Sequence, residues 1–153
     1  MILKYTTFIF KYISLISITL FFSFPANSEL SVEETIKGRK AIFSKNYSTA
    51  KKVQSLASNG DFDEAKILML EMSKNYNALL KYFPENSKEG FKTEAKLMIW
   101  DDKENFNNLM KKSSNDMIEL ASIIKDSDNA KLSITKFMWS NCKTCHSKYR
   151  EEH

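Results

Sequence analysis

The sequence predicts an all-α fold, an antiparallel four-helix bundle. Three observations support this prediction. The 153 residues include only three glycines and two prolines, which leaves little turn chemistry for a sheet. Apolar residues recur at helical spacing in four separate segments. Two of the three connections between these segments are short, and short connections join antiparallel neighbours in a bundle.

The first 28 residues have the layout of a secretory signal peptide. Lys4 and Lys11 give a basic start, residues 12–24 form an uncharged apolar run, and Ala26 and Ser28 make a small-x-small cleavage site. The alternative is an uncleaved membrane anchor, but the run is shorter than the roughly 20 residues that a spanning helix needs. We expect cleavage after Ser28, leaving residues 29–153 as one exported domain with no stable membrane insertion.

The charge of this mature domain is nearly balanced. It carries 21 basic and 19 acidic side chains, for a net charge of about +2. The balance gives no reason to propose nucleic acid as a partner, and no basic block indicates a membrane surface.

The first predicted helix covers residues 31–58, with Ser31 and Glu34 in a capping-box pattern and a stop at Asn59 and Gly60. Its apolar positions are Val32, Ile36, Phe43, Tyr47, Val53 and Leu56. The second helix starts at Asp61, where Glu64 again suggests a capping box, and ends before Pro84. Its apolar face comprises Phe62, Ala65, Leu68, Met69, Met72, Tyr76, Leu79 and Leu80.

A longer connection over residues 83–100 leads to the third predicted helix, residues 101–125. The inward residues of that helix are Phe106, Leu109, Met110, Met117, Leu120 and Ile124. The fourth helix covers residues 129–150, and Ile134, Met138, Cys142, Cys145 and Tyr149 step along one of its faces.

Both cysteines and one of the two histidines lie together in the stretch "NCKTCHSKYR". On a helix Cys142, Cys145 and His146 occupy positions i, i+3 and i+4, which share one face. C-x-x-C-H is the attachment motif of c-type haem. The two thiols would add to the haem vinyl groups, and the His146 imidazole would be the axial ligand of the iron.

Three other interpretations of the motif remain open. A thioredoxin-like dithiol also uses C-x-x-C, but it normally follows a strand in a βαβ unit. A zinc site needs about four ligands, and here only His153 is left to join the three. The third is a chance cluster without a cofactor. A disulfide between Cys142 and Cys145 would close a very small loop and stabilise the fold little.

With its C-x-x-C-H motif near the C-terminus of an exported helical chain, the sequence resembles a class II c-type cytochrome, and cytochrome c′ in particular. The strongest match is "CKTCHSKYR", and "IKGRKAIF" and "IWDDKENF" are weaker ones. The resemblance implies a haem propionate near Arg39, a distal position for Phe43 and a place near the proximal histidine for Arg150. The corresponding alternatives are a solvated surface arginine, ordinary core packing and a helix-terminal charge.

Low-spin relatives take a sixth iron ligand from a methionine of the first helix. Residues 29–68 contain no methionine and no histidine, so we expect five-coordinate iron with an apolar distal face at Phe43. The alternative is a six-coordinate electron carrier ligated by Met69, Met72, Met110 or Met117.

Two functions follow: electron transfer with a redox partner protein, and binding of nitric oxide or carbon monoxide. An apolar distal face without a hydrogen-bond donor works against stable oxygen binding. No catalytic constellation indicates an enzyme. The resemblance also implies a periplasmic location and dimers formed through the first two helices.

Overall fold

The computed structural model describes residues 30–125 and 127–152. The predicted signal peptide, residues 1–28, lies outside the described residues. No helix in the described ranges has the length and apolar content that crossing a membrane requires.

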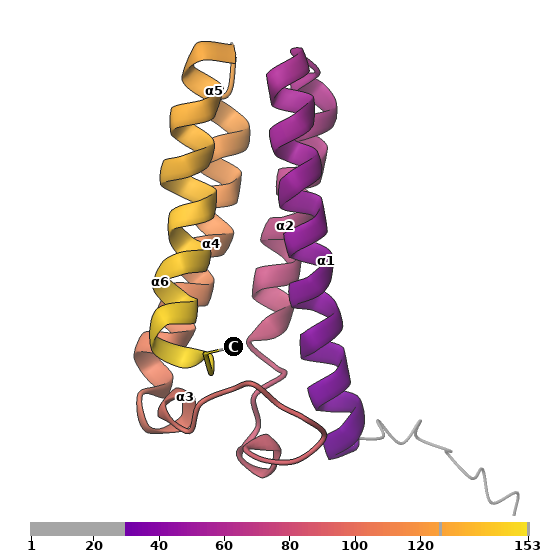
Figure 1. Cartoon of the computed structure of the whole chain (residues 1–153), viewed down its shortest axis with the longest axis vertical. Coiled ribbons are helices and arrows are strands. Elements are labelled where there is room, and N and C mark those ends of the chain that lie inside the picture. The colour runs from indigo at the N-terminus through magenta and orange to yellow at the C-terminus, as the bar shows by residue number, and fades with distance from the viewer. Residues whose placement is uncertain (1–29, 126, 153) are drawn as a thin grey trace, which may run out of the picture.

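Four long helical rods form an antiparallel bundle, as predicted (Figure 1). The first three rods are α1 (Val32–Asn59), α2 (Phe62–Leu79) and α4 (Lys103–Ile123). The fourth consists of α5 (Ser127–Ile134), the π-helical turn η2 (Thr135–Trp139) and α6 (Ser140–Tyr149). The long connection between α2 and α4 holds the 3-10 turn η1 (Glu85–Ser87) and the short helix α3 (Met98–Asp101).

The two predicted capping boxes have different outcomes. At the start of α1 the Ser31 hydroxyl accepts a bond from the Glu34 amide, and the Glu34 carboxylate accepts one from the Ser31 amide. The box predicted at Asp61 is wrong, because no side-chain capping bond forms there. The Asp61 torsions, φ −80° and ψ 57°, depart from the extended conformation that lets a capping side chain reach back to the helix.

The fourth rod contains a feature that helical periodicity does not predict. Over Thr135–Trp139 the backbone adopts π-helical bonding, and the Ser140 amide donates to the carbonyl of Thr135. The Asn141 side chain donates to the Phe137 carbonyl at 2.6 Å and to the Asp116 carboxylate of α4 at 2.7 Å. This π turn comes directly before the helix that carries both cysteines, and Asn141 connects it to α4.

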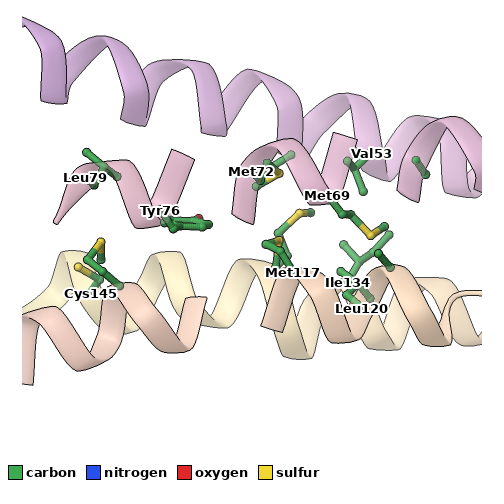
Figure 2. Packing of buried hydrophobic residues seen from close by; sticks show 14 of the residues in the cluster. Val53, Met69, Met72, Tyr76, Leu79, Met117, Leu120, Ile134 and Cys145 are labelled. Atoms are coloured by element: carbon green, nitrogen blue, oxygen red, sulfur yellow. The ribbon is translucent and has the colours of Figure 1, made fainter. Parts of the chain in front are cut away.

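The bundle core is built largely from methionine, leucine and isoleucine. Figure 2 shows Met69 and Met72 of α2 meeting Met117 and Leu120 of α4 and Ile134 of α5 across the interior. Most residues of the predicted inward faces of α2, α4 and the fourth rod are buried. The remaining ones are half-buried, namely Phe62, Leu68, Leu80, Leu109 and Cys142. On α1 the prediction fails for Tyr47, which is 55% exposed. The buried face of α1 instead includes three polar residues, Thr35, Arg39 and Asn46.

The rods diverge toward the end of the bundle that holds α6. There α1 packs against α2 and, farther along, against α5, while α6 packs against α4 and α3. In Figure 1 the chain's C-terminal end turns in between the two helical pairs at this end. The divergence leaves a cavity whose lining comes from both α1 and α6.

Candidate functional site

All six site residues predicted from the sequence line one cavity of about 730 Å³. They are Arg39 and Phe43 from α1, with Cys142, Cys145, His146 and Arg150 from the end of the chain. The volume falls within the roughly 300–1,000 Å³ that small-molecule and cofactor sites occupy. The fold therefore brings the two residues of α1 and the four residues at the end of the chain to a common space, although they are far apart in the sequence.

Both cysteines are free thiols in the cavity wall, Cys142 half-buried and Cys145 6% exposed. Burial raises the pKa of Cys142, and burial together with the neighbouring Cys142 raises the pKa of Cys145 to about 12. Catalytic dithiols work as thiolates with a lowered pKa. The electrostatic environment of this pair is the reverse of what a dithiol oxidoreductase needs.

His146 follows Cys145 on α6, and its ring contacts the ring of Phe43 in the cavity lining. The two ring centroids are 6.3 Å apart with 67° between the planes. Partial burial of the imidazole and the nearby Arg150 charge lower the pKa of His146, against an opposing effect of Glu94. A neutral imidazole keeps a nitrogen lone pair available for a metal.

Arg150 belongs to a short segment that ties the end of the chain to the connection between α2 and α4. Its Nε donates to Glu94 Oε2 at 2.9 Å, and an isolated antiparallel bridge joins it to Ala95. The Tyr149 hydroxyl donates to the Asp102 carboxylate at 2.6 Å, and Lys148 pairs with the same carboxylate. Arg150 is thus an ion-paired residue beside His146, rather than a free charge at a helix end.

Arg39 is not a solvated surface arginine, because it is only 2% exposed. Its guanidinium donates to the carbonyls of Tyr82 and Ser87 and to the hydroxyls of Ser87 and Thr93, at 2.6–3.2 Å. It also lies 4.7 Å from the centroid of the Phe83 ring. Arg39 therefore organises the connection between α2 and α4 at the point where that connection borders the cavity.

Several polar residues of the cavity were not predicted as site residues, and two buried ones among them are Asn46 and Tyr76. Asn46 lies one helical turn beyond Phe43 on the inward face of α1, and Tyr76 lies on the inward face of α2. The signal for Asn46 was available, since a polar residue three positions after Phe43 interrupts an inward-facing stripe. Tyr76 was assigned to the apolar core, and its ring is buried as predicted.

The lining fits a haem group. Aromatic and aliphatic side chains supply a flat apolar enclosure, namely Phe43, Tyr76, Phe83, Ile99, Phe106 and Met110. Two thiols and one imidazole lie on the same helix, and the lining also contains the cationic side chains of Arg39, Lys40 and Arg150. Among the described residues, no group of three or more histidine, cysteine or acidic side chains is placed to hold a metal ion alone. The zinc interpretation therefore lacks a ligand set in this part of the chain.

Comparisons with known proteins agree with this lining. The sequence profile described as Cytochrome C′ matches residues 34–150. The chain is 30% identical to cytochrome c′ of Rhodopseudomonas palustris over 120 residues, which is 76% of this chain and 82% of that protein.

Solved structures show the same fold. A mutant of the Rhodopseudomonas palustris cytochrome c′ superposes with a TM-score of 0.72 at 26% identity, covering 78% of this chain and 98% of that one. The nitric oxide complex of a mutant cytochrome c prime from Alcaligenes xylosoxidans gives a TM-score of 0.69 at 17% identity, covering 81% and 99%. This chain therefore belongs to the cytochrome c′ family, and like the members of that family it binds covalently attached haem c.

Proposed function

We propose that Cys142 and Cys145 form the two thioether links to this haem, that His146 is the axial ligand, and that the iron keeps an open position on the side of Phe43. When bound, the haem supplies a one-electron redox centre and a site for diatomic ligands. The protein then transfers electrons to and from a redox partner protein and binds nitric oxide or carbon monoxide. This function involves no enzymatic turnover.

One observation carries the proposal: both thiols and the His146 imidazole line a single cavity whose opposite wall is the Phe43 ring. The helix α6 holds the three attachment groups on one face, and α1 presents a side chain that cannot ligate iron. Because the raised thiol pKa values oppose thiolate chemistry, covalent attachment to a cofactor is the better use of the pair.

The positions of the methionines support a five-coordinate iron. Met69, Met72 and Met117 belong to the bundle core (Figure 2). They are absent from the cavity lining, whereas Met110 of α4 is in it. The alternative is a six-coordinate iron in a protein that only carries electrons. Among the described methionines, Met110 is then the remaining candidate for the sixth iron ligand.

Nitric oxide enters the proposal through a relative and through the cavity itself. The Alcaligenes xylosoxidans cytochrome c prime, which shares the fold, has been solved as a nitric oxide complex. The half-buried Phe43 ring borders the space opposite His146, and so would control how easily a diatomic ligand enters.

We place the mature protein in the periplasm, because the first 28 residues have the layout of an export signal.

A homodimer through α1 and α2 is part of the same proposal. Ile67 and Leu70 of α2 are exposed apolar residues on the outside of that helical pair, and sedimentation of the Ile67→Lys variant tests their contribution.

Intact-mass spectrometry of the exported protein tests the attachment. Expression together with a haem-maturation system should give the mature chain plus one haem, stable to denaturation and acid extraction. Cys142→Ala and Cys145→Ala should each retain a single, weaker link, and the double variant should lose the haem on extraction. A double variant that keeps haem after extraction would disprove the thioether assignment.

A further inference from the structure

We propose that Asn46 and Tyr76 form a donor pair in the cavity that hydrogen-bonds an acceptor atom of a small ligand beside Phe43. The proposal rests on the haem-binding function above and extends it to ligand selectivity. It also replaces the expectation of a distal face without a hydrogen-bond donor.

Asn46 is 3% exposed and lines the cavity, yet its Nδ2 donates to no partner in the described residues. Its Oδ1 accepts a hydrogen bond of 2.8 Å from Asn75 of α2. With its oxygen held by Asn75, the amide leaves its NH₂ group unpaired in the cavity wall.

Tyr76 supplies the second donor. It is 5% exposed, and its hydroxyl meets the Cys142 sulfur at 3.9 Å, a weak contact (Figure 2 shows the ring opposite Cys145). A thioether at Cys142 would carry no S–H to donate, so the tyrosine proton would have only a poor sulfur acceptor. Burial raises the pKa of Tyr76, which keeps the hydroxyl protonated and able to donate.

The two groups line the same cavity, and the Asn46 amide lies near the Tyr76 hydroxyl without forming a hydrogen bond of normal length to it. Both residues line the same cavity as Phe43, and Asn46 lies one turn from Phe43 on α1. A buried donor without an acceptor is costly, and an acceptor atom placed between the two groups removes that cost. The ligand class is a small molecule or anion with a lone pair on its outer atom, such as fluoride, nitrite or dioxygen.

Two probes of the holoprotein test the proposal: fluoride binding to the ferric form, and the C–O stretching frequency of the carbon monoxide complex of the ferrous form. Asn46→Leu removes the amide at similar volume, and Tyr76→Phe removes only a hydroxyl. Losing one hydrogen bond to a bound anion should raise the fluoride Kd about tenfold in each variant. The C–O frequency should rise in both, because donors near the oxygen lower it.

Asn107→Leu is the matched control. Asn107 also has a buried side-chain atom without a partner, but it does not line the cavity. Its fluoride Kd and C–O frequency should equal those of the unmodified protein. The helical circular dichroism signal and the haem content show whether each variant is folded. If Asn46→Leu does not fold, Tyr76→Phe still tests the proposal, because it removes only a hydroxyl and keeps the ring in place.

The outcomes separate the two levels of the proposal. If carbon monoxide binds but both variants keep the original Kd and frequency, or if the Asn107 control shifts equally, the donor pair is disproved while the open iron site stands. If the unmodified protein binds neither probe, the open iron site fails and the donor pair fails with it.

Discussion

The ring of Phe43 on α1 faces the imidazole of His146 on α6 with its edge, at 6.3 Å between centroids. The two residues differ in what they offer a metal: His146 carries a nitrogen that can bind iron, and Phe43 carries no ligand atom. The chemistry of the site depends on what α1 presents at this position.

Phe43→Met should convert the iron from high spin to low spin. The substitution places a thioether, which can ligate haem iron, on α1 in contact with His146. Absorption spectra of the ferric and ferrous forms would show the change, together with slower carbon monoxide binding. Phe43→Leu is the control, since it alters the size without adding a ligand. A Phe43→Met protein with high-spin spectra and unchanged binding would show that α1 does not form the distal wall.

Arg39→Met should destabilise the fold by about 3 kcal/mol, measured by urea unfolding of the holoprotein. The variant leaves the Tyr82 and Ser87 carbonyls without their guanidinium donor, in a region where Ser87 is fully buried. Arg39→Lys keeps a charge but cannot make the forked set of bonds, so it should recover only part of the loss.

Lys37→Met is the matched control on the same helix. Lys37 is exposed and pairs with Glu33, so its loss should change the free energy of unfolding by less than about 0.5 kcal/mol. If Arg39→Met were as mild as this control, the guanidinium would not be organising the connection between α2 and α4.

Gly38→Ala should destabilise the protein although alanine is the better helix former. A Cβ at Gly38 would lie 2.4 Å from Cε1 of Tyr82, so the tyrosine ring must move. Overpacking of this kind costs about 1–3 kcal/mol, against a gain of up to about 1 kcal/mol from helix propensity.

A double-mutant cycle isolates the clash at Gly38. In a Tyr82→Ala background the ring is gone, and Gly38→Ala should become neutral or stabilising. If Gly38→Ala is equally harmful in both backgrounds, contact with Tyr82 is not the reason for the glycine.

Asp102 should make stability depend on pH in the acid range. Hydrogen bonds from Lys148, Tyr149 and Asn105 lower the pKa of Asp102 to about 2 from an ordinary value of 3.8. Because the pKa of Asp102 is lower in the folded state than in the unfolded chain, its ionised carboxylate stabilises the fold at pH values above the unfolded pKa. This stabilisation is lost as the pH falls from about 4 to about 2. Urea midpoints of the unmodified protein and of Asp102→Asn should thus differ at pH 6 and converge near pH 2.

Asp101→Asn removes a neighbouring exposed carboxylate and is the comparison for this effect. Its difference from the unmodified protein should change less between pH 6 and pH 2 than that of Asp102→Asn. Equal pH dependence in both variants would exclude a specific role of the Asp102 contacts with α6.

The sequence predicted those parts of the structure that local pattern controls. Four segments with amphipathic helical periodicity predicted the four rods. The spacing of Cys142, Cys145 and His146 predicted that they share one helix face. Both predictions work because the direction of a side chain follows from its position along the helix. The π turn at Thr135–Trp139 was not predicted, since it leaves the apolar spacing nearly unchanged and depends on Asn141 meeting Asp116 of α4. The capping box predicted at Asp61 does not form, because it requires backbone torsions that a residue type does not determine.

Long-range contacts account for what the sequence could not show at the site. Arg39 meets partners 43 to 54 positions away, and Arg150 meets Glu94 56 positions away. For Arg39 the sequence suggested either a place near a haem propionate or a solvated surface position, and it did not predict burial against the connection between α2 and α4. Asn46 was passed over because an asparagine within a helix is usually exposed, and only its burial against Asn75 makes its unused donor visible.

The visible spectrum of the exported holoprotein, ferric, then reduced with dithionite, then exposed to carbon monoxide, tests the central claim most directly. A haem held by Cys142, Cys145 and His146 with an open site at Phe43 predicts a Soret band and a broad high-spin ferrous band that shifts with carbon monoxide. Sharp low-spin ferrous bands that ignore carbon monoxide would mean that a sixth ligand such as Met110 reaches the iron. The absence of any Soret band after expression with haem-maturation machinery would contradict the account.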